Sequence, residues 1–154
     1  MLLLYFIVLL HSLPGPRQMS SDTIVKVVAP GVSAHAGKDA VVNVSVLVKK
    51  GYHIQAHKVN DEFIIPTSLD IVENNIIITG KQAFPAGKKF KIEGSENYLL
   101  VYDGEFKITI PFKVQEEIPK GKYTLQAKLH YQACDDKTCF APKTINFDIG
   151  VQVI

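Results

Sequence analysis

The stretch that decides the fold is Lys122-Tyr123-Thr124-Leu125-Gln126-Ala127-Lys128-Leu129-His130-Tyr131-Gln132-Ala133, with Cys134 directly behind it. Its side chains alternate without a break: Tyr123, Leu125, Ala127, Leu129, Tyr131 and Ala133 fall on one face, and the polar residues between them fall on the other. This two-residue period is typical of a β-strand with one buried face. If the same parity continues, Cys134 emerges on the polar side, where another protein can reach it.

The same period recurs along the rest of the chain. It predicts strands at residues 40–48, 106–114 and 145–153, shorter strands at 66–72 and 76–79, and a loop at 84–89. Pro111 has no backbone N–H, so its strand should lie at a sheet edge or contain a bulge. No segment shows a convincing helical period. We therefore predict one domain over residues 21–154, an all-β, immunoglobulin-like β-sandwich of about seven to ten strands.

The N-terminus carries an unbroken apolar run of nine residues, Leu2 to Leu10. The run is too short for a bilayer span, which needs about 20 apolar residues, and it matches the apolar region of a secretory signal. No Lys or Arg precedes it, and no clear A-x-A cleavage site follows it. We assign residues 1–20 to a signal peptide and expect no membrane span in the mature chain. Export would place the chain where disulfides persist.

Composition excludes several classes of function. The formal net charge of +2 implies no nucleic-acid partner. The sequence contains no GxSxG, HExxH, P-loop or dinucleotide-binding fingerprint, so catalysis by those routes has no support. With 154 residues, the chain can bury a core without needing disulfides for stability. Its cysteines therefore need another explanation.

The two cysteines, Cys134 and Cys139, are separated by four residues. Asp135, Asp136 and Lys137 between them suit a tight turn, so a bond between the thiols would close a small ring. Such a ring stabilises the fold by only about 2 kcal/mol, because the entropy it removes from the unfolded chain scales with the logarithm of loop length. A bond that is made and broken in turn therefore explains the pair better than a permanent local disulfide. A secreted β-sandwich interaction module with such an inert disulfide stays the alternative.

A metal site is the third alternative. His130 with Cys134 and Cys139 offers three soft or borderline ligands, but no second cluster of ligands accompanies them. His53 and His57 share a parity if their segment is extended, and a solvated or partly packed pair explains them better than a metal. We therefore predict neither a metal nor a cofactor.

Two segments around the cysteines form a recognisable pattern. Tyr131-Gln132-Ala133-Cys134 and Cys139-Phe140-Ala141-Pro142 fit a YQxC…C(F/Y)xP signature, and Lys50-Gly51-Tyr52-His53 and a Tyr102–Val114 strand precede them in matching order. Over about residues 21–154 the chain resembles the N-terminal domain of the thiol:disulfide interchange protein DsbD, an exported redox protein of bacteria.

That resemblance implies an immunoglobulin-like sandwich and a protein-disulfide reductase component. Such a domain takes electrons from a membrane-embedded reductase system through a thioredoxin-like domain. It passes them to periplasmic thioredoxin-fold proteins, in processes that include cytochrome c biogenesis. The resemblance makes Cys139 the cysteine that enters mixed disulfides with partners, and Cys134 the cysteine that resolves them.

The family also shields its cysteines with a cap loop that bears an aromatic residue. The corresponding segment here is about residues 92–98, with Tyr98 or Phe90 as the aromatic. Four residues separate the cysteines in this chain, where the best-known members have five.

Side chains near the pair are further candidates. Tyr52, Tyr98 and Phe140 are candidates for shielding the sulfurs or contacting a partner. We expect Lys137 and His130 to lower a cysteine pKa, and Asp135 and Asp136 to raise it. Tyr131 is expected in the core because of its strand parity.

Overall fold

The computed structural model describes residues 18–154, apart from residues 61, 73, 92 and 95. Its thirteen strands are β1 (Gln18–Ser21), β2 (Val25–Ala29), β3 (Val32–Ala34), β4 (Asp39–Val48), β5 (His53–Gln55), β6 (Ser68–Ile71), β7 (Ile77–Thr79), β8 (Lys88–Lys91), β9 (Tyr98–Tyr102), β10 (Glu105–Val114), β11 (Gly121–Tyr131), β12 (Ala133–Cys134) and β13 (Lys143–Val153). The described residues contain no helix. In particular, none of them forms a helix long and apolar enough to cross a membrane.

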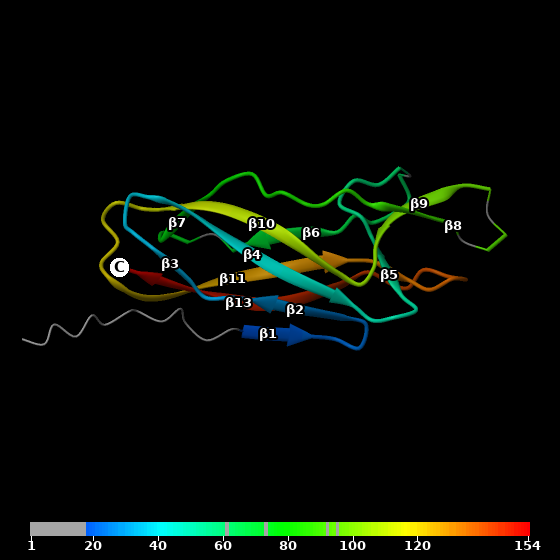
Figure 1. The fold of residues 1–154 in the computed structure, drawn as a ribbon, viewed down its shortest axis with the longest axis horizontal. Helices are drawn as coiled ribbons and strands as arrows, with labels where there is room; N and C mark the ends of the chain where they lie inside the picture. The colour runs from blue at the N-terminus through cyan, green and yellow to red at the C-terminus, as the bar shows by residue number, and fades with distance from the viewer. Residues whose placement is uncertain (1–17, 61, 73, 92, 95) are drawn as a thin grey trace, which may run out of the picture.

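Two sheets form the body of the sandwich (Figure 1). One has the strand order β1-β2-β4-β10-β7, and the other has the order β3-β13-β11-β6. Neighbouring strands are antiparallel except β3 and β13, which are parallel. The all-β, immunoglobulin-like sandwich predicted from the alternation is therefore confirmed.

The alternation of side chains explains the single core between these sheets. In β11, Leu125, Ala127 and Leu129 are buried while Gln126 and Lys128 are exposed. The buried residues of β4, β10 and β13 join them in one apolar cluster. Burial of this apolar surface is the main force that holds the sheets together.

A third, smaller sheet forms one end of the molecule. It has the order β12-β5-β9-β8, and in Figure 1 its strands lie at the opposite end from the C-terminus. The turn between β4 and β5 contains Gly51, whose φ of 87° lies in the left-handed region that favours glycine. This turn directs β5 to the cysteine loop, where it pairs with β12.

The prediction for Pro111 is wrong about the edge. Its strand, β10, lies between β4 and β7 in the interior of its sheet. The Pro111 carbonyl accepts a hydrogen bond from the Gly80 N–H at 2.8 Å, just past the end of β7. The N–H that Pro111 lacks would point to the same side, where β7 has already ended. The proline therefore costs the sheet no hydrogen bond between β7 and β10.

One predicted boundary differs from the structure. The segment 84–89, expected to be a loop, contains the start of β8 at Lys88. Strand β1 begins at Gln18 and pairs with β2, and the assignment of residues 1–20 to a signal peptide stays a prediction. The rest of that assignment, residues 1–17, lies outside the described residues.

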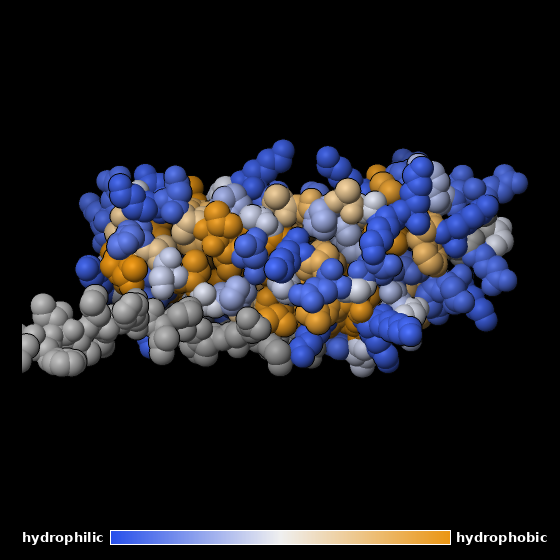
Figure 2. Space-filling model, in the orientation of Figure 1, coloured by the Kyte–Doolittle hydropathy of each residue, from blue (hydrophilic) through white to orange (hydrophobic). Residues whose placement is uncertain are grey.

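Most of the surface in view is polar, with scattered apolar patches (Figure 2). Charged side chains gather at the end that carries β8 and β9. That end also holds the cysteine loop.

Candidate functional site

A disulfide joins Cys134 and Cys139 at the tip between β12 and β13, with an S–S distance of 2.05 Å. The two residues face each other as an isolated antiparallel bridge, and the Phe140 N–H donates to the Ala133 carbonyl at 2.8 Å. Cys134 is fully buried at 0% exposure, whereas Cys139 is partly exposed. Of the two cysteines, only Cys139 therefore has surface that a partner could contact.

The expectation that Cys134 lies on the polar side is wrong. Strand β11 ends at Tyr131, and the chain then changes sheets: Ala133 pairs with Ile54 and Cys134 pairs with His53. This change of partner ends the earlier parity, and both Ala133 and Cys134 are buried.

The loop between the cysteines is held by one carboxylate. Asp135 Oδ1 accepts hydrogen bonds from the N–H groups of Lys137 at 2.9 Å and Thr138 at 2.8 Å. These hydrogen bonds lower the pKa of Asp135. Asp136 and Lys137 are exposed at the tip, and the Asp136 carbonyl accepts a hydrogen bond from the Glu93 N–H at 3.4 Å. The connection between β8 and β9 therefore touches the cysteine loop.

Gln55 lies beneath the disulfide and is fully buried. Its Nε2 lies 3.1 Å from Cys134 Sγ and 3.7 Å from Cys139 Sγ. Sequence reasoning did not identify this residue. The local sequence gives no signal for it, since Gln55 stands between His53 and His57 in a segment without a regular alternation.

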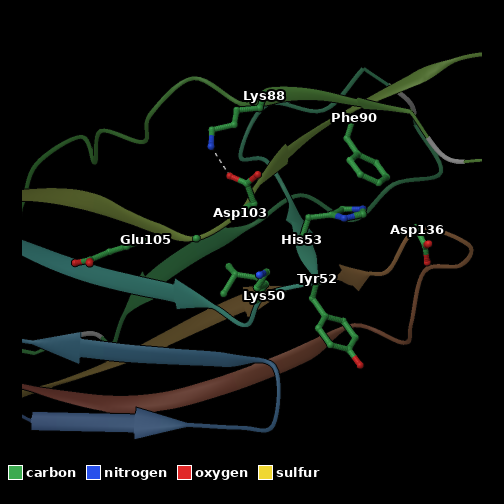
Figure 3. A pocket seen from close by; sticks show the side chains of 11 residues that line it. Lys50, Tyr52, His53, Lys88, Phe90, Asp103, Glu105 and Asp136 are labelled. Atoms are coloured by element: carbon green, nitrogen blue, oxygen red, sulfur yellow. Dashed lines mark hydrogen bonds and ion pairs between the residues drawn. The ribbon is translucent and has the colours of Figure 1, made fainter.

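His53 forms one wall of an open pocket beside the site (Figure 3). Its ring packs on Phe90, with 3.9 Å between the centroids, and only 4% of the residue is exposed. Burial lowers the pKa of His53, although the carboxylates of Asp135, Asp103 and Asp136 act in the opposite direction. The pocket also contains the Lys88–Asp103 ion pair.

The structure brings together two of the three aromatic candidates. The ring centroids of Tyr52 and Phe140 lie 6.1 Å apart. Phe140 directly follows Cys139, and Tyr52 directly precedes His53, which pairs with Cys134. Tyr98 is 42% exposed, and Lys89 Nζ lies 4.6 Å from the centre of its ring. Of the two candidates for a cap aromatic, Phe90 is the one whose ring packs on His53, in the strand paired with Cys134.

His130 is engaged on the outside of the second sheet. Its Nδ1 lies 2.8 Å from Thr144 Oγ1 and its Nε2 lies 3.1 Å from Asp70 Oδ2. The described residues contain no group of three or more His, Cys, Asp or Glu side chains that could hold a metal ion. Tyr131 is buried in the core, as predicted, and its hydroxyl donates to Asp22.

The comparisons with known proteins agree with the cysteine motif. The family model for the thiol:disulfide interchange protein DsbD, N-terminal, matches residues 21–150. The chain belongs to the DsbD N-terminal domain family. No curated protein matches the sequence.

Two solved structures are similar to this chain. The N-terminal periplasmic domain of ScsB from Proteus mirabilis is similar with a TM-score of 0.58 and 15% identity, over 83% of this chain and 47% of that one. This chain thus spans about half the length of that structure, and the likeness concerns the fold. The reduced N-terminal domain of DsbD from Neisseria meningitidis gives a TM-score of 0.47 and 21% identity, over 76% of this chain and 82% of that one.

Proposed function

We propose that this domain exchanges its Cys134–Cys139 disulfide with the dithiols of partner proteins. The observation that carries the proposal is the asymmetry of the bond: Cys139 is partly exposed and Cys134 is fully buried. A thiolate attacks along the axis of an S–S bond and needs access to the sulfur that it attacks. Membership of the DsbD N-terminal domain family supports this chemistry.

Reduction of the domain proceeds in two displacements. A partner thiolate attacks Cys139 Sγ, a mixed disulfide forms, and the old bond breaks with its electron pair on Cys134 Sγ. The second cysteine of the partner then displaces Cys139 from the mixed disulfide. The partner leaves as a disulfide, and the domain holds two electrons as a pair of thiols, with protons from the partner thiols or from water.

Delivery of the electrons reverses these steps. The Cys139 thiolate attacks the disulfide of an acceptor, and Cys134 resolves the mixed disulfide. We assign the donor to a thioredoxin-like domain or protein served by a membrane-embedded reductase system, and the acceptors to thioredoxin-fold proteins of the periplasm, including those of cytochrome c biogenesis. This assignment rests on the family.

Side chains around the tip would adjust access and reactivity. Phe140 is covalently adjacent to Cys139 and lies near Tyr52, so we assign both to the partner-contacting surface. Lys137 favours a thiolate at the tip by its charge, whereas Asp135 and Asp136 oppose one.

Trapping of the mixed disulfide tests the proposal. A thioredoxin with a single active-site cysteine is mixed with Cys134→Ala domain that has been activated at Cys139 by an aromatic disulfide reagent. A one-to-one adduct that dithiothreitol cleaves is expected, formed through Cys139. The matched control is Cys139→Ala, whose remaining thiol is buried and should give at least tenfold less adduct.

The outcome that contradicts the proposal is an inert bond. If the wild-type disulfide resists thioredoxin and dithiothreitol until urea unfolds the domain, the bond is a permanent local disulfide. Near-ultraviolet circular dichroism recorded during reduction distinguishes a folded, reduced domain from an unfolded one.

A further inference from the structure

We infer that Gln55 is a catalytic residue of the exchange, which stabilises the departing Cys134 sulfur and so selects Cys139 as the sulfur that is attacked. This inference rests on the proposed function. It concerns a contact between the Gln55 side chain and the reacting atoms, because Gln55 Nε2 lies 3.1 Å from Cys134 Sγ.

The charge that forms during exchange explains why a donor is needed at this place. When the S–S bond breaks, negative charge develops on the sulfur that leaves. Cys134 is fully buried, so water does not solvate that charge, and an unsolvated buried charge is costly. A thiolate is a much stronger acceptor than a disulfide sulfur. The hydrogen bond from the Gln55 side-chain N–H therefore stabilises the breaking bond more than it stabilises the intact disulfide.

The two distances give the contact a direction. Gln55 Nε2 lies 3.1 Å from Cys134 Sγ and 3.7 Å from Cys139 Sγ. The shorter contact favours Cys134 as the leaving sulfur. Solvent exposure of Cys139 leads independently to the same order of events.

Two hydrogen bonds fix the backbone of Gln55, and complete burial restricts its side chain, so the side-chain amide is held near the sulfurs before the reaction. The Gln55 N–H donates to the Gln132 carbonyl at 3.0 Å, and the Thr67 hydroxyl donates to the Gln55 carbonyl. Thr67 is itself fully buried. A donor held in place before the reaction needs no reorganisation when charge develops.

The other half of the amide favours the reduced state. Gln55 Oε1 is buried and has no hydrogen-bond partner among the described residues. The disulfide sulfurs carry no hydrogen, whereas a thiol offers an S–H donor. Reduction introduces S–H groups beside this amide and, where the Cys134 sulfur is a thiolate, gives Nε2 a better acceptor than the disulfide does. We therefore expect Gln55 to raise the reduction potential of the pair.

The test is a redox equilibrium measured with glutathione for the wild type and for Gln55→Met. Methionine has a similar length but offers no N–H donor. We expect the equilibrium constant for reduction to fall about tenfold, which is about 30 mV for a two-electron couple. The rate of reduction by dithiothreitol should fall about tenfold as well. Gln55→Asn, which draws the donor back by one methylene, should shift both in the same direction.

Tyr102→Phe is the matched control. The Tyr102 hydroxyl donates to the Pro85 carbonyl at 2.9 Å and accepts from the His57 N–H at 3.1 Å, so this variant loses partly buried hydrogen bonds of the same small sheet but none made by Gln55. The control should lose stability in urea, while its glutathione equilibrium should stay within about twofold of wild type. If Gln55→Met does not fold, Gln55→Asn decides the question.

The outcomes separate this inference from the proposed function. A wild-type bond that stays closed while the domain is folded overturns the proposed function. A wild type that exchanges, with Gln55 variants whose equilibrium and rate lie within twofold of it or shift towards easier reduction, overturns the role of Gln55 alone. Equal changes in Tyr102→Phe and Gln55→Met also overturn it, because a general loss of packing in this sheet then explains the effect.

Discussion

Replacing Asp22 by Asn should remove a pH-dependent anchor between the N-terminal segment and the core. The Asp22 carboxylate accepts hydrogen bonds from the N–H groups of Ile24 and Val25 at 2.7 and 2.9 Å, from Lys143 Nζ at 3.0 Å and from the Tyr131 hydroxyl. Burial raises the pKa of Asp22, but these four donors outweigh it and lower the pKa from 3.8 to about 2.

The sign and size of the effect on the free energy of unfolding follow from the difference between the pKa of Asp22 in the unfolded and in the folded chain. A carboxyl group with a lower pKa in the folded state stabilises the fold above the unfolded pKa, because the unfolded chain binds the proton more readily. The change from 3.8 to about 2 corresponds to about 2.4 kcal/mol at pH 7. At pH 2.5 about 0.8 kcal/mol of this remains. Asparagine keeps an acceptor oxygen but no charge, so Asp22→Asn should lose most of this amount at pH 7.

The assay is urea unfolding of wild type and Asp22→Asn at pH 7 and pH 2.5. The matched control is Asp70→Asn, whose carboxylate pairs with His130 but is 67% exposed, so it should cost at most about 1 kcal/mol. A loss for Asp22→Asn that is the same at both pH values, or no larger at pH 7 than that of the control, would refute the reasoning.

Two further predictions concern the loop and the pocket. Asp135→Ala removes the acceptor that holds the turn, so reclosure of the reduced pair should slow about three- to tenfold in stopped-flow reoxidation, while Asp135→Asn and Asp136→Ala stay near wild type. Phe90→Ala uncovers His53, and since burial is the main cause that lowers its pKa, that pKa should rise towards 6.5 in an NMR titration. An unchanged His53 titration, or an equal rise in Tyr98→Ala, would show that the Phe90 ring does not control it.

The strands could be predicted from the sequence because side-chain alternation is a local property. Strands β4, β10, β11 and β13 all bury the face that the two-residue period indicates. The cysteine pair could also be identified from the sequence, since both members lie in one short segment with turn residues between them.

The sequence could not predict which strands become neighbours. Cys134 leaves the parity of β11 because β12 pairs with β5, about 80 residues earlier in the chain. Pro111 is tolerated inside a sheet because β7 ends beside it. Gln55 contacts the sulfurs through the same pairing of β5 with β12, so no local pattern could assign it to the site.

The bond between Cys134 and Cys139 encloses only residues 134–139, at one end of a sandwich held together by its own core. Opening the bond therefore frees a short piece of chain and leaves the strands of both main sheets paired. We expect such a domain to fold before any oxidant reaches it. Under the proposed function, we also expect its bond to be reduced and reoxidised repeatedly without a partly unfolded form that proteases would recognise.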